Sequence, residues 1–111
     1  MRKDEYLGNF DLMLLLAILR LGDDAYGVTI AQELEQQTGR EVVIASVYAR
    51  LERLQERGLV TSNLGDSTPE RGGRAKRYFR ITAAGIREVR DARQALMKMW
   101  KGLPEVKGEQ A

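Results

Sequence analysis

Apolar residues recur every three to four positions in four segments of the chain, and every second position in a fifth segment, which predicts four helices and a β-strand. The helices are expected at residues 7–21, at about 25–38 and 45–57, and at 83–103. Gly22, Gly39 and Gly58 follow the first three helices and are expected to end them. The first helix is apolar on every side from Leu12 to Leu19, which requires burial on more than one face.

The second and third helices differ in their outward faces. The second follows Asp23 and Asp24, either of which can cap its free amides. The third buries a narrow stripe of Val47, Leu51 and Leu54, and its opposite face carries small or polar residues, namely Ala45, Ala49 and Glu52. Small outward residues let a helix approach a surface closely, and flanking cations would meet the walls of a groove. The same pattern is also that of an ordinary amphipathic surface helix.

A β-hairpin is expected after the third helix. Its strands are residues 59–64 and 77–82, and a loop of about a dozen residues joins them. In the second strand Phe79 and Ile81 share one face, while Tyr78 and Arg80 share the other. Loops of this length are often functional or mobile. Before the third helix, Val42 and Ile44 are compatible with a short strand or an extended link.

Positive charge is concentrated in this loop and the strand that follows. Five cations and a single carboxylate lie between Glu70 and Arg80, whereas the whole chain has 18 Lys and Arg against 16 Asp and Glu. A basic loop suits a polyanion, because each neutralised phosphate releases counterions and adds affinity without a shaped pocket. A solvated turn with no ligand is the alternative interpretation.

The last helix carries a stripe with alternating spacings of three and four. Thr82 is expected to cap this helix, and Pro104 to follow its end; the stripe comprises Ile86, Val89, Arg93, Leu96, Trp100 and Leu103. One charged member in an apolar seam can fix the register of two paired helices. We therefore expect the helix to pair with its copy in a homodimer, although it could also fold back on its own domain. The expected division is residues 1–82, a dimerisation helix at 83–103 and a flexible tail at 104–111.

Composition excludes several kinds of chemistry. The chain has 111 residues, no cysteine and no histidine. Thiolate chemistry, zinc sites built on Cys or His, and acid–base catalysis by His are therefore excluded, and we expect no cofactor, no metal and no enzymatic activity. The start has no signal-peptide character, and the longest apolar run is too short to span a bilayer. The expected location is the cytoplasm.

The order of three helices, a hairpin and a last helix is that of a winged helix-turn-helix with an appended dimerisation helix. The expected fold is thus mainly α with a small β-hairpin, in which the third helix enters the DNA major groove and the hairpin forms a wing on the backbone. The chain resembles the PadR family of bacterial transcriptional regulators in Tyr26-Gly27, in Ser46-Val47-Tyr48 with Leu51, Arg53-Leu54 and Gly58-Leu59-Val60, and in the strand at 76–82 with Gly85. It departs from the usual family residues at Ala45, Ser46, Val47 and Phe79. Its single last helix is similar to that of the short PadR subfamily.

This resemblance implies a dimeric regulator, most often a repressor, that releases a palindromic operator when a small aromatic molecule or another signal arrives. Ser46 and Tyr48 are expected to contact phosphate or base, and Arg50 or Arg53 can pair with guanine. The full set of candidate DNA-binding residues is Ser46, Tyr48, Ala49, Arg50 and Arg53 on the third helix, and Arg71, Arg74, Lys76, Arg77 and Tyr78 on the wing.

Three alternatives accompany these expectations. Tyr48 could be a core aromatic with a solvated hydroxyl. Leu96, Met97 and Trp100 are the candidate effector-binding residues, yet Trp100 could simply fill the dimer seam. The whole domain could also be a winged-helix module that binds protein without specific DNA binding.

Overall fold

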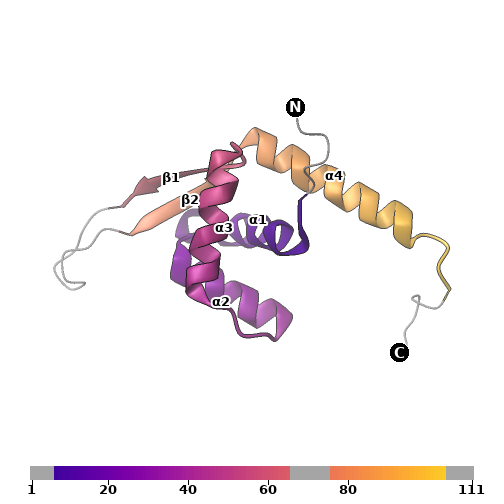
Figure 1. Cartoon of the computed structure of the whole chain (residues 1–111), viewed down its shortest axis with the longest axis horizontal. Coiled ribbons are helices and arrows are strands. Elements are labelled where there is room, and N and C mark those ends of the chain that lie inside the picture. Colours follow the sequence, from indigo (N-terminus) through magenta and orange to yellow (C-terminus); the bar gives the residue numbers. More distant parts are fainter. Residues whose placement is uncertain (1–6, 66–75, 105–111) are drawn as a thin grey trace.

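The computed structural model describes residues 7–65 and 76–104, and it has the expected order of elements. Figure 1 shows the helices α1 (Asn9–Leu21), α2 (Gly27–Thr38), α3 (Ile44–Glu56) and α4 (Ala83–Trp100), with the strands β1 (Val60–Leu64) and β2 (Arg77–Ile81) between α3 and α4. The prediction of a mainly helical winged fold with one small hairpin is confirmed.

The start of α2 differs from the prediction. Asp23 and Asp24 do not cap this helix; with Gly22 they form a 3₁₀ turn, and α2 begins after Tyr26. The Tyr26 amide donates to the Thr29 hydroxyl at 3.0 Å, which is the reciprocal half of a capping box. At the other end Gly39 adopts the expected left-handed conformation, with φ 73°. The aspartates are too early in the chain because an extended pair, Ala25-Tyr26, intervenes.

The segment between α2 and α3 is an extended link and contains no strand. The carboxylate of Glu35 accepts a hydrogen bond from the Val42 amide at 2.8 Å, and this bond holds the link against α2. Ile44, which the sequence pattern placed in the link, is the first residue of α3. The link therefore sets where α3 starts relative to α2.

The hairpin is joined to the helices along one of its edges. β1 and β2 are antiparallel, with Val60 opposite Ile81 and Leu64 opposite Arg77. On the other edge of β2, the Phe79 amide donates to the Ala25 carbonyl at 2.9 Å, and Tyr26 forms an isolated bridge with Tyr78. The short extended segment before α2 thus pairs with β2 on the edge that β1 leaves open.

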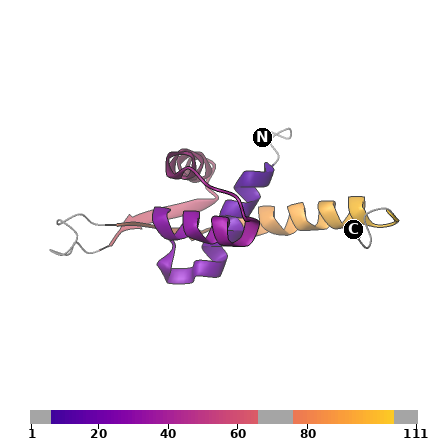
Figure 2. The same cartoon turned by 90° about the horizontal axis from the view of Figure 1, so that it is seen from below.

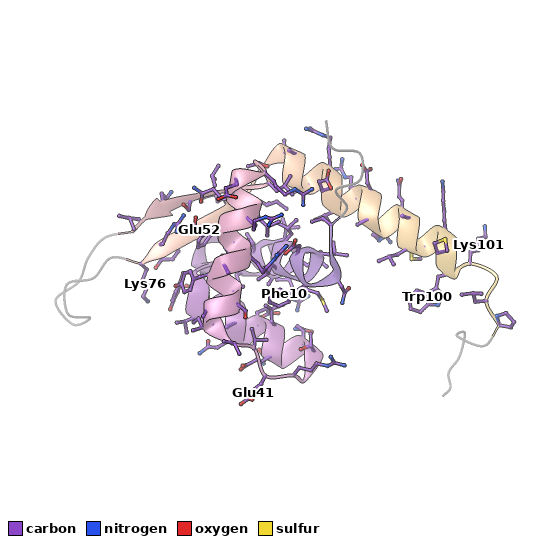
Figure 3. The ribbon with its side chains drawn as sticks, in the orientation of Figure 1. Phe10, Glu41, Glu52, Lys76, Trp100 and Lys101 are labelled. Carbon is purple, nitrogen blue, oxygen red and sulfur yellow. The ribbon has the colours of Figure 1, made fainter. Side chains whose placement is uncertain are left out.

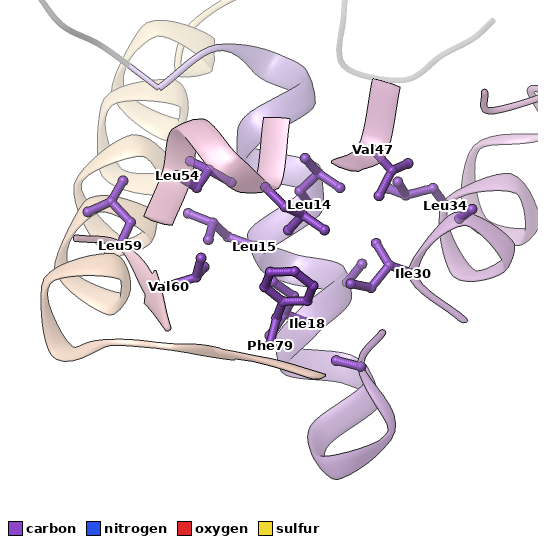
Figure 4. Packing of buried hydrophobic residues seen from close by; sticks show 14 residues of the cluster. Leu14, Leu15, Ile18, Ile30, Leu34, Val47, Leu54, Leu59, Val60 and Phe79 are labelled. Atoms are coloured by element: carbon purple, nitrogen blue, oxygen red, sulfur yellow. The ribbon is translucent and has the colours of Figure 1, made fainter. Parts of the chain in front are cut away.

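A single apolar core lies where α1, α2, α3 and the hairpin meet (Figure 4). The predicted stripe of α3 is fully buried there. Residues of α1, α2, the turn before β1 and the two strands are buried with it: Leu14, Leu15, Ile18, Ile30, Leu34, Leu59, Val60 and Phe79. Each large apolar side chain buried in this way contributes about 1.5–3 kcal/mol. The core therefore fixes α3 and β2 relative to one another.

α4 starts on this core and then leaves it. The Thr82 hydroxyl accepts from the Gly85 amide at 3.0 Å, as the sequence predicts for a cap. Gly85 is buried, and a side chain there would overlap the Leu59 carbonyl and Ile81. α4 and the wing extend from the helical body in opposite directions (Figures 1 and 2).

The far end of α4 falls short of the prediction. The helix ends at Trp100, three residues before Leu103, because Lys101 leaves the helical conformation with ψ 132°; Gly102 follows in a left-handed conformation with φ 85°. Within the part of the chain that the structure describes, no helix is long and apolar enough to cross a membrane.

Candidate nucleic-acid interface

The outward face of α3 is accessible, as the sequence predicts. The predicted outward residues Ala45, Ala49 and Glu52 are all exposed, although Glu52 pairs with Arg77. The flanking Ser46 and Arg53 are exposed as well, and the apolar stripe on the opposite side is buried. Arg53 has no ion-pair partner among residues 7–65 and 76–104. The helix therefore presents a narrow surface of small side chains with one free cation beside it.

Tyr48 lies at the junction of α3 and α2. The residue is 38% exposed, and its ring and hydroxyl occupy the space that a side chain at position 27 would need. Gly27 is buried for this reason. Tyr48 is thus neither a core aromatic nor a free surface side chain, because its ring rests on the first turn of α2.

Arg50 has a partner that the sequence pattern did not indicate. Its Nε and Nη2 atoms donate to the two carboxylate oxygens of Asp11 at 2.8 and 2.6 Å. Asp11 is 4% exposed and is the only buried charged residue in the described part of the chain. These hydrogen bonds raise the pKa of the Arg50 guanidinium above its ordinary value. The sequence signal that could have indicated this ion pair is Asp11, the single carboxylate within the apolar first helix.

Arg77, a predicted DNA ligand on the wing, also has partners within the fold. It donates to Glu52 at 2.6 Å, to Ser62 at 3.0 Å and to Gln55 at 3.1 Å. Its guanidinium also lies 5.1 Å from the centre of the Phe79 ring. Figure 3 shows Glu52 on the side of α3 that faces the strands. Arg77 therefore ties the wing to α3.

Lys76 and Tyr78 lie with Tyr26 at the base of the wing. The Lys76 Nζ donates to the Tyr26 hydroxyl at 3.0 Å and lies 4.1 Å from the centre of that ring. The rings of Tyr26 and Tyr78 meet edge to face, with their centres 5.3 Å apart. The lysine ammonium has three donors, so two stay available. Of the remaining wing candidates, Arg71 and Arg74 lie outside the described residues.

The three effector candidates lie within the last two turns of α4, but they do not line one common groove. Leu96 lines a groove of about 500 Å³ between the start of α1 and α4, with Leu12, Ala92 and Met99 among its other walls. Trp100 lies at the far end of α4 (Figure 3), beside Leu103 and Pro104. Met97 is exposed, and it lines neither the groove beside Leu96 nor the surface around Trp100.

No group of His, Cys, Asp or Glu among the residues that the structure describes could hold a metal ion. α3 and the wing instead carry hydroxyl, ammonium and guanidinium donors around a face of small side chains. Such donors bind phosphates and base edges.

Comparison with known proteins agrees with this geometry. Residues 15–91 match the family model described as "Transcriptional regulator PadR-like family". An uncharacterized protein of Lysinibacillus sphaericus is 32% identical over 107 residues, which cover 95% of this chain and 90% of that protein.

Solved structures share the fold. A transcriptional regulator from Clostridium thermocellum superimposes with a TM-score of 0.73 at 22% identity, over 97% of this chain and 99% of that one. A PadR family transcriptional regulator from Eggerthella lenta gives a TM-score of 0.66 at 23% identity, over 82% and 76% of the two chains. PadR-family regulators are non-enzymatic DNA-binding proteins, which confirms the prediction that the chain is not an enzyme. The chain belongs to the PadR-like family of transcriptional regulators.

Proposed function

We propose that this regulator binds an operator by placing α3 in the major groove and the wing along the DNA backbone, and that it acts as a ligand-responsive repressor. The observation that carries the DNA-binding mode is the outward face of α3, where Ala45 and Ala49 leave room for close approach beside the exposed Ser46 and Arg53. A helix with such a face suits the floor of a groove, where base edges are read.

In this proposal some polar residues contact DNA, and others stabilise the fold. Ser46 and Arg53 are available for phosphate or base, and the Tyr48 hydroxyl for phosphate. Lys76 keeps two donors for the backbone. Arg77 is assigned a bracing role, because its donors already serve Glu52, Gln55 and Ser62.

The DNA-binding mode predicts a salt-dependent affinity for duplex DNA that Arg53 and Arg77 affect differently. Replacing Arg53 with Ala should reduce the slope of log affinity against log salt by about one if the side chain contacts a phosphate, or cost about 1–3 kcal/mol at one operator position if it reads guanine. Thermal stability should stay unchanged, because Arg53 is exposed and unpaired among the described residues. The measurement is a titration of random and selected duplexes at several salt concentrations.

Arg77→Ala is compared with Arg53→Ala because Arg77 contacts other residues of the fold, so its main effect is expected on stability. Its lost hydrogen bonds should lower the free energy of unfolding by about 1 kcal/mol. A wild-type protein with no affinity for any duplex at low salt would contradict the proposal and favour a module that binds protein.

We further propose that the working form is a homodimer in which α4 of a second copy covers the groove between α1 and α4. Exposed apolar side chains lie on α1 at Leu16 and Leu19, on α4 at Leu96 and Trp100, and just beyond α4 at Leu103. Leu12 and Leu96 already line the groove between these helices. A two-fold arrangement would bury the same patch on both copies.

The dimer proposal predicts that Leu96→Glu dissociates the protein. A carboxylate buried at the seam without a partner costs several kcal/mol. Gln94→Glu adds the same charge on an exposed position of α4 and should leave the dimer intact. Sedimentation at micromolar concentration distinguishes the two variants, and a wild-type monomer there would disprove the dimer.

A site for a planar aromatic effector between the subunits is the third part of the proposal. Trp100 is the single tryptophan of the chain and is 54% exposed, and the neighbouring Met97 can adjust to varied shapes. Two such surfaces facing one another would stack a flat molecule.

Planar cationic dyes should then quench Trp100 fluorescence in a saturable way, and Trp100→Ala should weaken dye binding while the protein stays dimeric. No response to a broad dye panel would leave Trp100 as a packing residue.

A further inference from the structure

The strongest unassigned feature is the fork between Asp11 and Arg50, which joins the first turn of α1 to the middle of α3. The two residues are 39 positions apart in sequence, and both carboxylate oxygens are engaged. The Asp11 side chain is 5% exposed, whereas that of Arg50 is 40% exposed. One end of the pair is therefore fixed inside the fold, and the other end reaches the surface.

Arg50 retains the means to bind an anion. A guanidinium carries five N–H donors, and Asp11 accepts from the Nε and Nη2 atoms. The remaining donors, including both on Nη1, belong to a side chain that is partly exposed. The position of Arg50 on the helix is also informative, because it borders the buried stripe and follows Ser46 by one turn. That is the flank of α3 that faces α1, away from the small outward residues Ala45 and Ala49.

We propose that Arg50 binds a backbone phosphate at the wall of the major groove and that Asp11 is the positioning residue that holds its guanidinium there. This inference rests on the proposed DNA-binding mode. A helix that enters a groove meets base edges along its outward face and phosphates along its flanks. Arg50, tethered on a flank, is thus assigned to phosphate, and the unpaired Arg53 is left to reach the bases.

The physical advantage is preorganisation. A free arginine must give up rotamer freedom when it binds, whereas Arg50 is already held at two points. Arginine suits this task because its planar fork can grip a carboxylate on one edge and an anion on another. A lysine at the same position would bring the charge without the fixed direction.

The decisive variant is Asp11→Asn. Removing a carboxylate near a polyanion should, on charge alone, strengthen DNA binding. A positioning role predicts the opposite: affinity for random duplex should fall by about threefold or more, the effect of one lost hydrogen bond. Arg50→Lys should keep the wild-type salt slope and lose affinity to a similar extent, because it retains the charge and loses the two-point grip.

The double variant Asp11→Asn with Arg50→Gln removes both charges without leaving a buried carboxylate unpaired. It should reduce the slope of log affinity against log salt by about one, on random and selected duplexes alike. Arg87→Ala, an exposed cation on α4, is the matched control and should bind as the wild type does. Circular dichroism checks that each variant is folded, and the double variant decides the question if Asp11→Asn does not fold.

Three results would overturn this inference. They are an Asp11→Asn protein that binds DNA as tightly as the wild type or more tightly, an unchanged salt slope in the double variant, and a loss confined to the selected duplex, which would assign Arg50 to a base. If the wild-type protein binds no duplex at all, the proposed DNA-binding mode itself fails, and this outcome is distinct from the other three.

Discussion

Phe79 is the residue through which the wing, the core and the first two helices are joined. The residue is 2% exposed within the apolar core, and its amide donates to the Ala25 carbonyl just before α2. Because side chains alternate along a strand, burying Phe79 turns Tyr78 and Arg80 to the other face of β2. The same strand register places Tyr78 against Tyr26 and makes Leu64 and Arg77 the last pair of the two strands. The place of the wing relative to α3 therefore depends on Phe79, together with the Arg77 contacts to α3.

Several cations that look available in the sequence are engaged within the fold. Arg50 is held by Asp11, Arg77 by Glu52 and its neighbours, and Lys76 by Tyr26. Exposed ion pairs contribute little to stability, and Arg77–Glu52 is of this kind, but Asp11 is buried and would be costly to leave alone. These contacts fix the directions of the basic side chains. These three cations thus brace α3 and the wing through contacts within the fold, and Arg53 is the cation of α3 that stays free among the described residues.

The parts of the structure that sequence alone could predict are those that follow local periodicity. The buried stripe of α3, the Thr82 cap and the pairing of β1 with β2 all follow from spacing and turn residues. The Asp11–Arg50 fork could not be found in this way, because it joins positions 39 apart and the chain has 16 acidic residues to choose from. The cap of α2 was misplaced onto Asp23 and Asp24 because nothing local shows that Ala25 and Tyr26 pair with β2. The stripe on α4 was predicted from its heptads, and its members Leu96 and Trp100 are exposed on the single chain.

Native-state hydrogen exchange at the Phe79 amide tests the central role of this residue most directly. If the strand is locked by the core and by the Ala25 carbonyl, this amide should exchange only through global unfolding, as slowly as the amides of Leu14 and Leu15 in the middle of α1. Its opening free energy should then equal the free energy of unfolding measured with urea. An opening free energy several kcal/mol below that value would mean that the wing detaches on its own. That result would contradict the claim that Phe79 fixes the wing to the helices.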